Sequence, residues 1–173
     1  MNTYYTLEEK YLQAVDKYSY GKTTKALRLL TEIIANEPLY ARAHYQLGKI
    51  YYYEMEDYQT AGYHFKICME VEPSFPDVYY HYLQLVVFLN MEKLANTIAA
   101  KALTVPGVNL ASVYKFSGLI AEKNKHWAKA IEAYQRAFIE VTDKKQIESI
   151  EESLTRVRSK IQRSKIYLYN LIE

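Results

Sequence analysis

The chain has 173 residues, half of them hydrophobic, and its 22 basic and 20 acidic side chains give a net charge of +2. The hydrophobic fraction excludes a disordered chain, and the balanced charge argues against nucleic acid as the main partner, because nucleic-acid binding draws on a strongly positive field. The one cysteine, Cys68, cannot form an internal disulfide. No segment is apolar over the roughly 18 residues that a membrane span needs. No leader of basic and then apolar residues opens the chain, and the sequence therefore predicts a cytoplasmic protein without a membrane partner.

A period of about 35 residues runs through the sequence. Alanines recur with spacings of 35, 34 and 35 residues at Ala26, Ala61, Ala95 and Ala130. Prolines follow three of them, at Pro38, Pro73 and Pro106. Because proline cannot continue a helix, each proline is expected to end the second helix of a two-helix unit.

The first unit is expected to open at the capping box Thr6-x-x-Glu9 and to turn at Gly21. The second unit carries the clearest motif, which reads His44-x2-Leu47-Gly48-x2-Tyr51, then Ala61-x3-Phe65, then Pro73. It resembles the tetratricopeptide repeat, and the resemblance covers about residues 7–142. The third unit keeps the motif less well than the fourth, which has Gly118 and Ala130 in place.

The resemblance implies an all-α fold, a right-handed α-solenoid of about four helix-turn-helix repeats within residues 1–142. The expected repeats are residues 7–40, 41–75, 76–108 and 109–142. The same resemblance implies that the first helix of each repeat lines a concave face, where a segment of another protein would bind. It implies no enzymatic activity, and no cofactor or metal is expected.

Tyrosine is unusually abundant, with 19 residues, of which 15 precede Leu83. Aligned positions of the expected first helices put several tyrosines on the presumed concave face, and tyrosine is enriched in protein interfaces. The partner-binding residues predicted there are Tyr11, Val15, Tyr18, Arg42, Tyr45, Lys49, Tyr52, Tyr80 and Gln84. Packing between repeats is the alternative role for these tyrosines, and it is the expected one for Tyr51, Tyr58, Tyr79 and Tyr134.

Residues 143–173 are predicted to form one long C-terminal helix with an apolar heptad stripe. Its first half is expected to cap the last repeat, and its second half, basic and then apolar, to project. A second contact surface, for a partner or for a second copy of the chain, is predicted at Arg156, Arg163, Tyr167, Leu168 and Leu171. A solvated basic face is the alternative interpretation.

Two short motifs suggest a phosphate-binding loop and a metal site, but each lacks residues that such a site requires. Gly21-Lys22-Thr23 lacks the earlier glycine and the strand of a phosphate-binding loop. His64 and Cys68 share a helical face, but no second ligand pair accompanies them. The sequence therefore predicts a protein-interaction scaffold or adaptor. Two alternatives are a small chaperone for a secreted or assembling protein, similar in size and architecture to type III secretion translocator chaperones, and a self-assembling structural protein.

Overall fold

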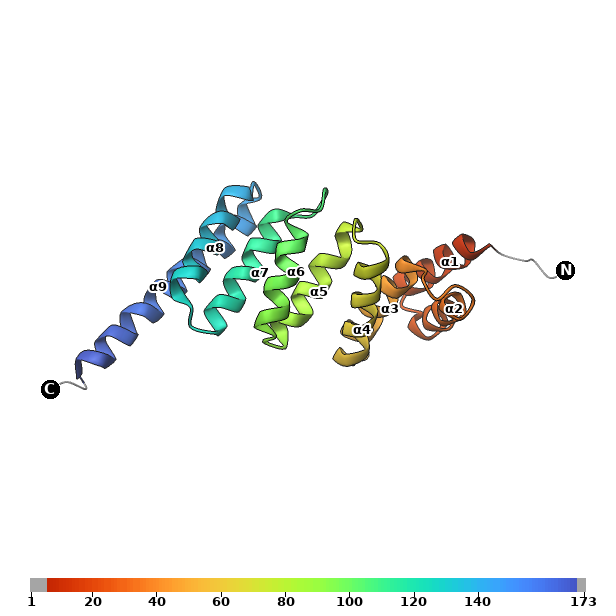
Figure 1. The fold of residues 1–173 in the computed structure, drawn as a ribbon, viewed down its shortest axis with the longest axis horizontal. Coiled ribbons are helices and arrows are strands. Elements are labelled where there is room, and N and C mark those ends of the chain that lie inside the picture. Colours follow the sequence, from red (N-terminus) through yellow and green to blue (C-terminus); the bar gives the residue numbers. More distant parts are fainter. Residues whose placement is uncertain (1–5, 171–173) are drawn as a thin grey trace. The chain divides into compact units, whose positions relative to one another are not determined.

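The computed structural model describes residues 6–170, with side chains up to residue 165. Over this range the chain forms nine helices and no strand (Figure 1). The helices are α1 (Leu7–Ser19), α2 (Thr23–Asn36), α3 (Ala41–Tyr53), α4 (Tyr58–Val71), α5 (Pro76–Phe88), α6 (Glu92–Ala102), α7 (Leu110–Lys123), α8 (Trp127–Glu140) and α9 (Lys144–Asn170). The predicted all-α class is therefore confirmed.

The chain divides into two compact units, Met1–Leu85 and Val86–Glu173, and the division falls within α5. The first unit contains the hairpins α1–α2 and α3–α4 and most of α5. The second contains the end of α5, α6, the hairpin α7–α8 and α9. The repeat bounds and the boundary at residue 142 that the sequence suggests stay predictions.

Short-range polar contacts explain where the helices begin. Thr6 and Glu9 form the predicted capping box at the start of α1, each side chain accepting a hydrogen bond from the other residue's backbone N–H. Asp57, Asn109 and Asp143 accept a backbone N–H three residues ahead in the same way. These acceptors satisfy N–H groups that have no partner inside the first turn of a helix.

The turns and helix ends follow from glycine and proline. Gly21 has a φ of 70° in the turn between α1 and α2, a backbone conformation that a residue with a side chain rarely adopts. The second helices α2 and α4 end at Asn36 and Val71, two residues before Pro38 and Pro73. The residue ahead of each proline is extended, with φ of −132° at Glu37 and −130° at Glu72, because a following proline disfavours helical geometry.

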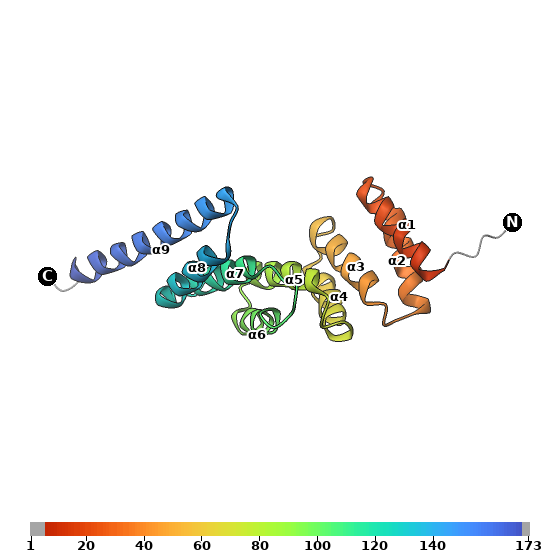
Figure 2. The ribbon, with the colours of Figure 1, turned by 90° about the horizontal axis from the view of Figure 1, so that it is seen from above.

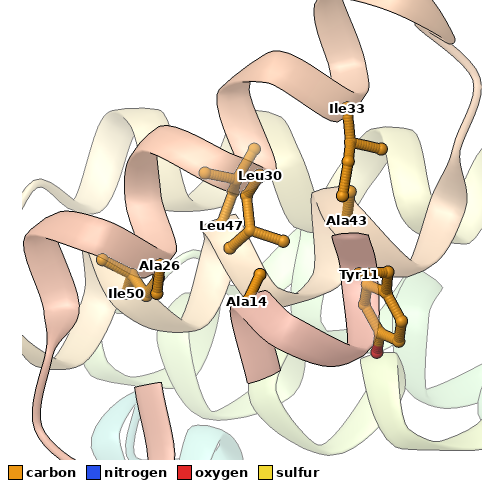
Figure 3. Close-up of a cluster of buried hydrophobic side chains, with 8 residues drawn as sticks. All are labelled: Tyr11, Ala14, Ala26, Leu30, Ile33, Ala43, Leu47 and Ile50. Carbon is orange, nitrogen blue, oxygen red and sulfur yellow. The ribbon is translucent and has the colours of Figure 1, made fainter. Parts of the chain in front are cut away.

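The core of the first unit lies between its two hairpins (Figure 3). Leu30 and Ile33 of α2 meet Leu47 and Ile50 of α3, and small alanines of α1, α2 and α3 fill the spaces between the larger side chains. Fully burying a leucine or isoleucine contributes about 1.5–3 kcal/mol each. The apolar stripe of α2 therefore anchors α1 and α3 to the same helix.

In each unit a glycine of a first helix lies close to an aromatic ring of the second helix of the same hairpin. In α3, a Cβ atom added at Gly48 would lie 2.5 Å from the ring of Phe65 in α4. In α7, a Cβ atom added at Gly118 would lie 2.6 Å from the ring of Tyr134 in α8. Both rings are buried, so glycine is required at both positions for the hairpin to close.

The core of the second unit joins α7, α8 and α9. Tyr134 and Ala137 of α8 pack with Ile150, Leu154 and Val157 of α9, and Ile161 is partly buried against the same cluster. The predicted heptad stripe of α9 is thus in contact with α8 up to Ile161. Beyond α8 the helix continues to Asn170 (Figures 1 and 2).

The helix α9 lies beside α7 with an offset of one repeat length. The Lys115 ammonium donates a hydrogen bond to the Ser149 hydroxyl, 34 residues later, at 3.0 Å. The Arg156 guanidinium donates to Glu122, again 34 residues away, at 2.8 Å. The helix therefore occupies the place of the first helix of a further hairpin, although the chain supplies no second helix for it within the described residues.

Candidate functional site

Two of the tyrosines predicted to face a partner are buried. Tyr11 is 9% exposed and Tyr45 is 7% exposed. The Tyr11 ring lies at the edge of the core cluster, 5.7 Å from the Tyr40 ring (Figure 3). The Tyr45 ring meets the edge of Phe75 at 5.0 Å. Their rings pack between successive hairpins, the role that the sequence analysis held as the alternative.

Four other tyrosines of the first unit lie together and remain at least partly exposed. We call Tyr18, Tyr52, Tyr53 and Tyr80 the tyrosine surface; they come from the first helices α1, α3 and α5. Tyr53 and Tyr80 are 42% and 44% exposed, while Tyr18 and Tyr52 are half-buried. The rings of Tyr52 and Tyr53 are 4.6 Å apart. The surface therefore offers neighbouring aromatic rings on one side of the unit.

The sequence analysis missed Tyr53 and His81. The Tyr53 hydroxyl donates a hydrogen bond to Gln84 Oε1 at 2.8 Å and lies 2.8 Å from His81 Nδ1. Because the hydroxyl has a single proton, His81 Nδ1 carries a proton and donates it to the Tyr53 oxygen. These bonds connect the end of α3 to α5 and fix the Tyr53 ring. The alignment of first helices does not reveal this pair, because each of the two residues comes one position after a residue predicted to face the partner, Tyr52 or Tyr80.

Histidine 81 is surrounded by rings. It lies 5.6 Å from Tyr45, 5.1 Å from Tyr80 and 6.3 Å from Phe65, measured between ring centroids. Burial, and then the charge of Lys49, lower the pKa of His81 to about 4. At neutral pH the imidazole is therefore uncharged and acts as a rigid part of the surface.

Lys49 places a positive charge beside the tyrosine surface. Its Nζ lies 5.7 Å from the ring centroid of Tyr18 and 5.3 Å from that of Tyr45. Both distances suit a cation–π interaction, which holds the ammonium between α1 and α3. Burial lowers the pKa of Lys49, and the nearby charge of Asp77 opposes that change. The ammonium is thus half-desolvated, which favours its pairing with an anionic or carbonyl group of a ligand.

The remaining predicted residues lie on the same first helices, with Arg42 at the opposite end of α3 from Tyr52 and Tyr53. Arg42 is half-exposed and forms an ion pair with Glu8 at 3.6 Å. Val15 is partly buried against the core. Gln84 accepts the Tyr53 hydrogen bond and is half-buried. On the opposite side of Tyr53, the Tyr18 hydroxyl donates to Glu54 at 3.3 Å.

Two buried histidines form a pair inside the second hairpin. The Nδ1 atoms of His44 and His64 are 2.9 Å apart, and His44 Nε2 is 2.9 Å from the Pro38 carbonyl oxygen. The carbonyl can only accept, so His44 donates through Nε2 and accepts through Nδ1 from His64. Burial, and then the nearby His44, lower the pKa of His64 to about 4. The pair is accordingly neutral and structural, and no third ligand joins it among the described side chains.

Part of the basic stretch of α9 makes contacts inside the second unit. Arg156 and Lys160 both donate to Glu122 at 2.8 Å, and the Tyr134 hydroxyl donates to the same carboxylate at 2.8 Å. The Glu122 side chain is 3% exposed. Hydrogen bonds from Arg156 and from the other donors lower the pKa of Glu122 to about 2, against the effect of burial.

Arg156 therefore takes part in closing the second unit, while 45% of its side chain stays exposed, and its role in a second contact surface stays a prediction. Glu122 of α7 is buried, and a buried carboxylate requires a paired charge. Arg163 is exposed. Tyr167, Leu168 and Leu171 lie outside the residues whose side chains the structure describes.

The chemistry of the described residues contains no candidate for catalysis. Cys68 is buried, and burial raises the pKa of its thiol to about 12, so that it stays protonated. Among the helices between residues 6 and 170, none has the length and apolarity that crossing a membrane demands.

Comparison with known proteins establishes the fold. No family model matches the sequence, and no curated protein matches it. Among solved structures, a MamA RS-1 double mutant is 21% identical, with a TM-score of 0.70 over 92% of this chain and 96% of that chain. MamA from Desulfovibrio magneticus RS-1, residues 41 to the end, is also 21% identical, with a TM-score of 0.67 over 91% and 96%. Another MamA crystal structure is 16% identical, with a TM-score of 0.69 over 93% and 94%. The chain therefore has the tetratricopeptide-type fold of MamA.

Proposed function

We propose that this chain is a non-enzymatic scaffold that binds a segment of another protein on the tyrosine surface of its first unit. The observation that carries the proposal is the clustering of Tyr52, Tyr53 and Tyr80 at an exposed site on first helices. The fold supports a scaffold role, because tetratricopeptide-type folds present such helix faces to protein partners.

Tyrosine suits this role for physical reasons. A tyrosine ring contributes a large contact area and loses little conformational freedom on binding. Here the freedom is already reduced, because Tyr53 is held by Gln84 and His81 and Tyr18 is held by Glu54. A surface that is ordered before its ligand arrives avoids part of the entropic cost of association.

The charges beside the rings indicate the kind of segment that would bind. The half-buried ammonium of Lys49 favours a carboxylate or a backbone carbonyl group placed next to the aromatic contacts. The expected ligand is a peptide segment with apolar or aromatic side chains and at least one acidic residue.

The test is peptide selection on the full chain, followed by affinity measurement with the double variant Tyr52→Ala, Tyr80→Ala. We expect selected peptides to carry an acidic residue beside apolar ones. Loss of two interface tyrosines should weaken their binding at least about tenfold, since hot-spot truncations cost about 1.4 kcal/mol or more. Affinity is read by titration calorimetry, and retained helicity by circular dichroism.

The matched control is Tyr63→Ala. Tyr63 is 59% exposed on α4, a second helix, and does not belong to the tyrosine surface. Its removal should leave peptide affinity unchanged. Equal affinities for the double variant and the unaltered chain would reject this surface as the binding site. Selection of no peptide at all would reject the proposed function in its present form.

A further inference from the structure

The second unit has an open apolar groove between α8 and α9. It is lined by Phe138 and Ile139 of α8 and by Leu154 of α9, and encloses about 710 Å³. Ile139 is 78% exposed and Phe138 is 41% exposed. Large apolar side chains that stay this exposed beside one another mark a surface that another helix can cover.

The charges along the groove are arranged so that two antiparallel copies of α9 have complementary charges. Glu151 and Arg158 both line the groove, on either side of Leu154, and lie seven residues or about 10.5 Å apart on one face of α9. Among the side chains that the structure describes, neither takes part in an ion pair. When two copies of α9 run antiparallel with their centre between Leu154 and Thr155, each Glu151 faces the Arg158 of the other copy.

The next charges on this face do not oppose such pairing strongly. They are Lys144, which forms an ion pair with Glu148 at 3.9 Å, and Lys165, and both lysines are exposed. Each lies about 16 Å from the centre at 1.5 Å per residue, where two crossing helices have begun to diverge. The attractive pairs are therefore central and the repulsive ones peripheral.

We propose that the groove between α8 and α9 binds the same groove of a second copy of this chain, with the two α9 helices antiparallel. Phe138 and Ile139 of both copies are buried at the centre, and two Glu151–Arg158 pairs set the direction. This surface belongs to the second unit and is independent of the tyrosine surface.

The test measures the dimer dissociation constant of the full chain by sedimentation equilibrium. The unaltered chain should form dimers. Glu151→Arg and Arg158→Glu should each weaken the dimer about tenfold, because the two-fold symmetry places like charges opposite each other twice. The double variant that exchanges the two charges should recover the dimer, since the pattern is again complementary. Ile139→Asp should abolish it.

A mixture gives a sharper result. Combining the Glu151→Arg chain with the Arg158→Glu chain should yield a heterodimer that is tighter than either homodimer, because two arginines then face two glutamates. The control Glu152→Arg makes the same charge change one residue away, outside the groove, and should leave dimerisation unaltered.

A chain that stays monomeric at every concentration would overturn the proposal. A dimer that ignores these charges, or one in which the exchanged double variant fails to recover, would overturn it equally. Both results leave the tyrosine surface untouched, since its peptide binding is measured separately.

Discussion

In the first unit, the ends of successive first helices are joined by tyrosines; in the second unit, the corresponding positions are joined by charges. Tyr18 and Tyr53 use hydroxyl groups to reach Glu54 and Gln84. Glu122 instead binds Arg156 and Lys160 of the following helix. The repeat thus determines which positions meet a neighbour, while the residue type determines whether the place remains open to a ligand or is closed by the chain itself.

The largest predicted difference in stability between the two units is expected for the variant Glu122→Gln. The change leaves Arg156 and Lys160 without their carboxylate, and should lower the free energy of unfolding of the second unit by about 3 kcal/mol. Hydrogen exchange should accelerate in α9 and remain unchanged in α1–α4.

The control for this change is Glu132→Gln. Glu132 pairs with Arg136 at the same 2.8 Å, but both side chains are more than half exposed. A surface pair of this kind contributes less than about 0.5 kcal/mol. Equal destabilisation by the two variants would show that the buried ion pair of Glu122 stabilises the second unit no more than an exposed pair does.

A smaller effect is expected at the contact between a glycine and an aromatic ring that both units contain. Gly48→Ala forces a methyl group against the Phe65 ring, and Gly118→Ala does the same at Tyr134. Each should cost about 2 kcal/mol of unfolding free energy, as overpacking of a core typically does. Urea unfolding followed by circular dichroism measures the loss.

Gly62→Ala provides the matched comparison for the first unit. A Cβ atom at Gly62 would lie 3.6 Å from Leu85, an ordinary contact, so the better helix propensity of alanine should stabilise the chain by about 0.5 kcal/mol. Opposite signs at Gly48 and Gly62 are therefore expected. Destabilisation at Gly62, or none at Gly48, would contradict the close-approach argument.

The two units are also expected to differ in acid stability. The pKa of His64 and of His81 is lowered from 6.5 to about 4 in the first unit. Both imidazoles are neutral in the folded state, whereas the unfolded chain takes up protons below pH 6.5. The first unit should accordingly lose stability as the pH falls from 6.5 to 4, by at most about 3 kcal/mol per histidine.

The second unit should lose stability in a lower pH range. Glu122 has its pKa lowered from 4.5 to about 2, so its contribution is complete above pH 4.5 and disappears as the pH falls towards 2. Hydrogen exchange at a series of pH values, corrected for the intrinsic exchange rate, should show α3 and α4 opening first. Simultaneous opening of both units would contradict these assignments.

Much of the fold was predictable because the repeat motif is carried by residues whose function is steric. Gly48, Ala61 and Phe65 are spaced to bring two helices together, and their spacing predicts the hairpin without any long-range information. The all-α class and the turn at Gly21 followed in the same way. The division of the chain within α5 has no marker in the sequence, since α5 has neither proline nor glycine after Pro76.

The candidate site was only partly predictable, because exposure depends on neighbours that are distant in sequence. Tyr45 and Tyr80 occupy equivalent places in two repeats, yet one is 7% and the other 44% exposed. Tyr45 is covered by Phe75, which the loop before α5 supplies. Similarly, the charge count of α9 could not reveal that Glu122, 34 residues earlier, binds Arg156.

The offset of 34 residues between α7 and α9 has a consequence for how such a chain can change its length. The bonds from Ser149 and Arg156 require only a lysine and a glutamate at two places of the preceding first helix. A further hairpin inserted ahead of α9 would be capped equally well if it carried those two residues. The contacts that hold α9 thus depend on two residues of the preceding first helix and not on the number of repeats before it.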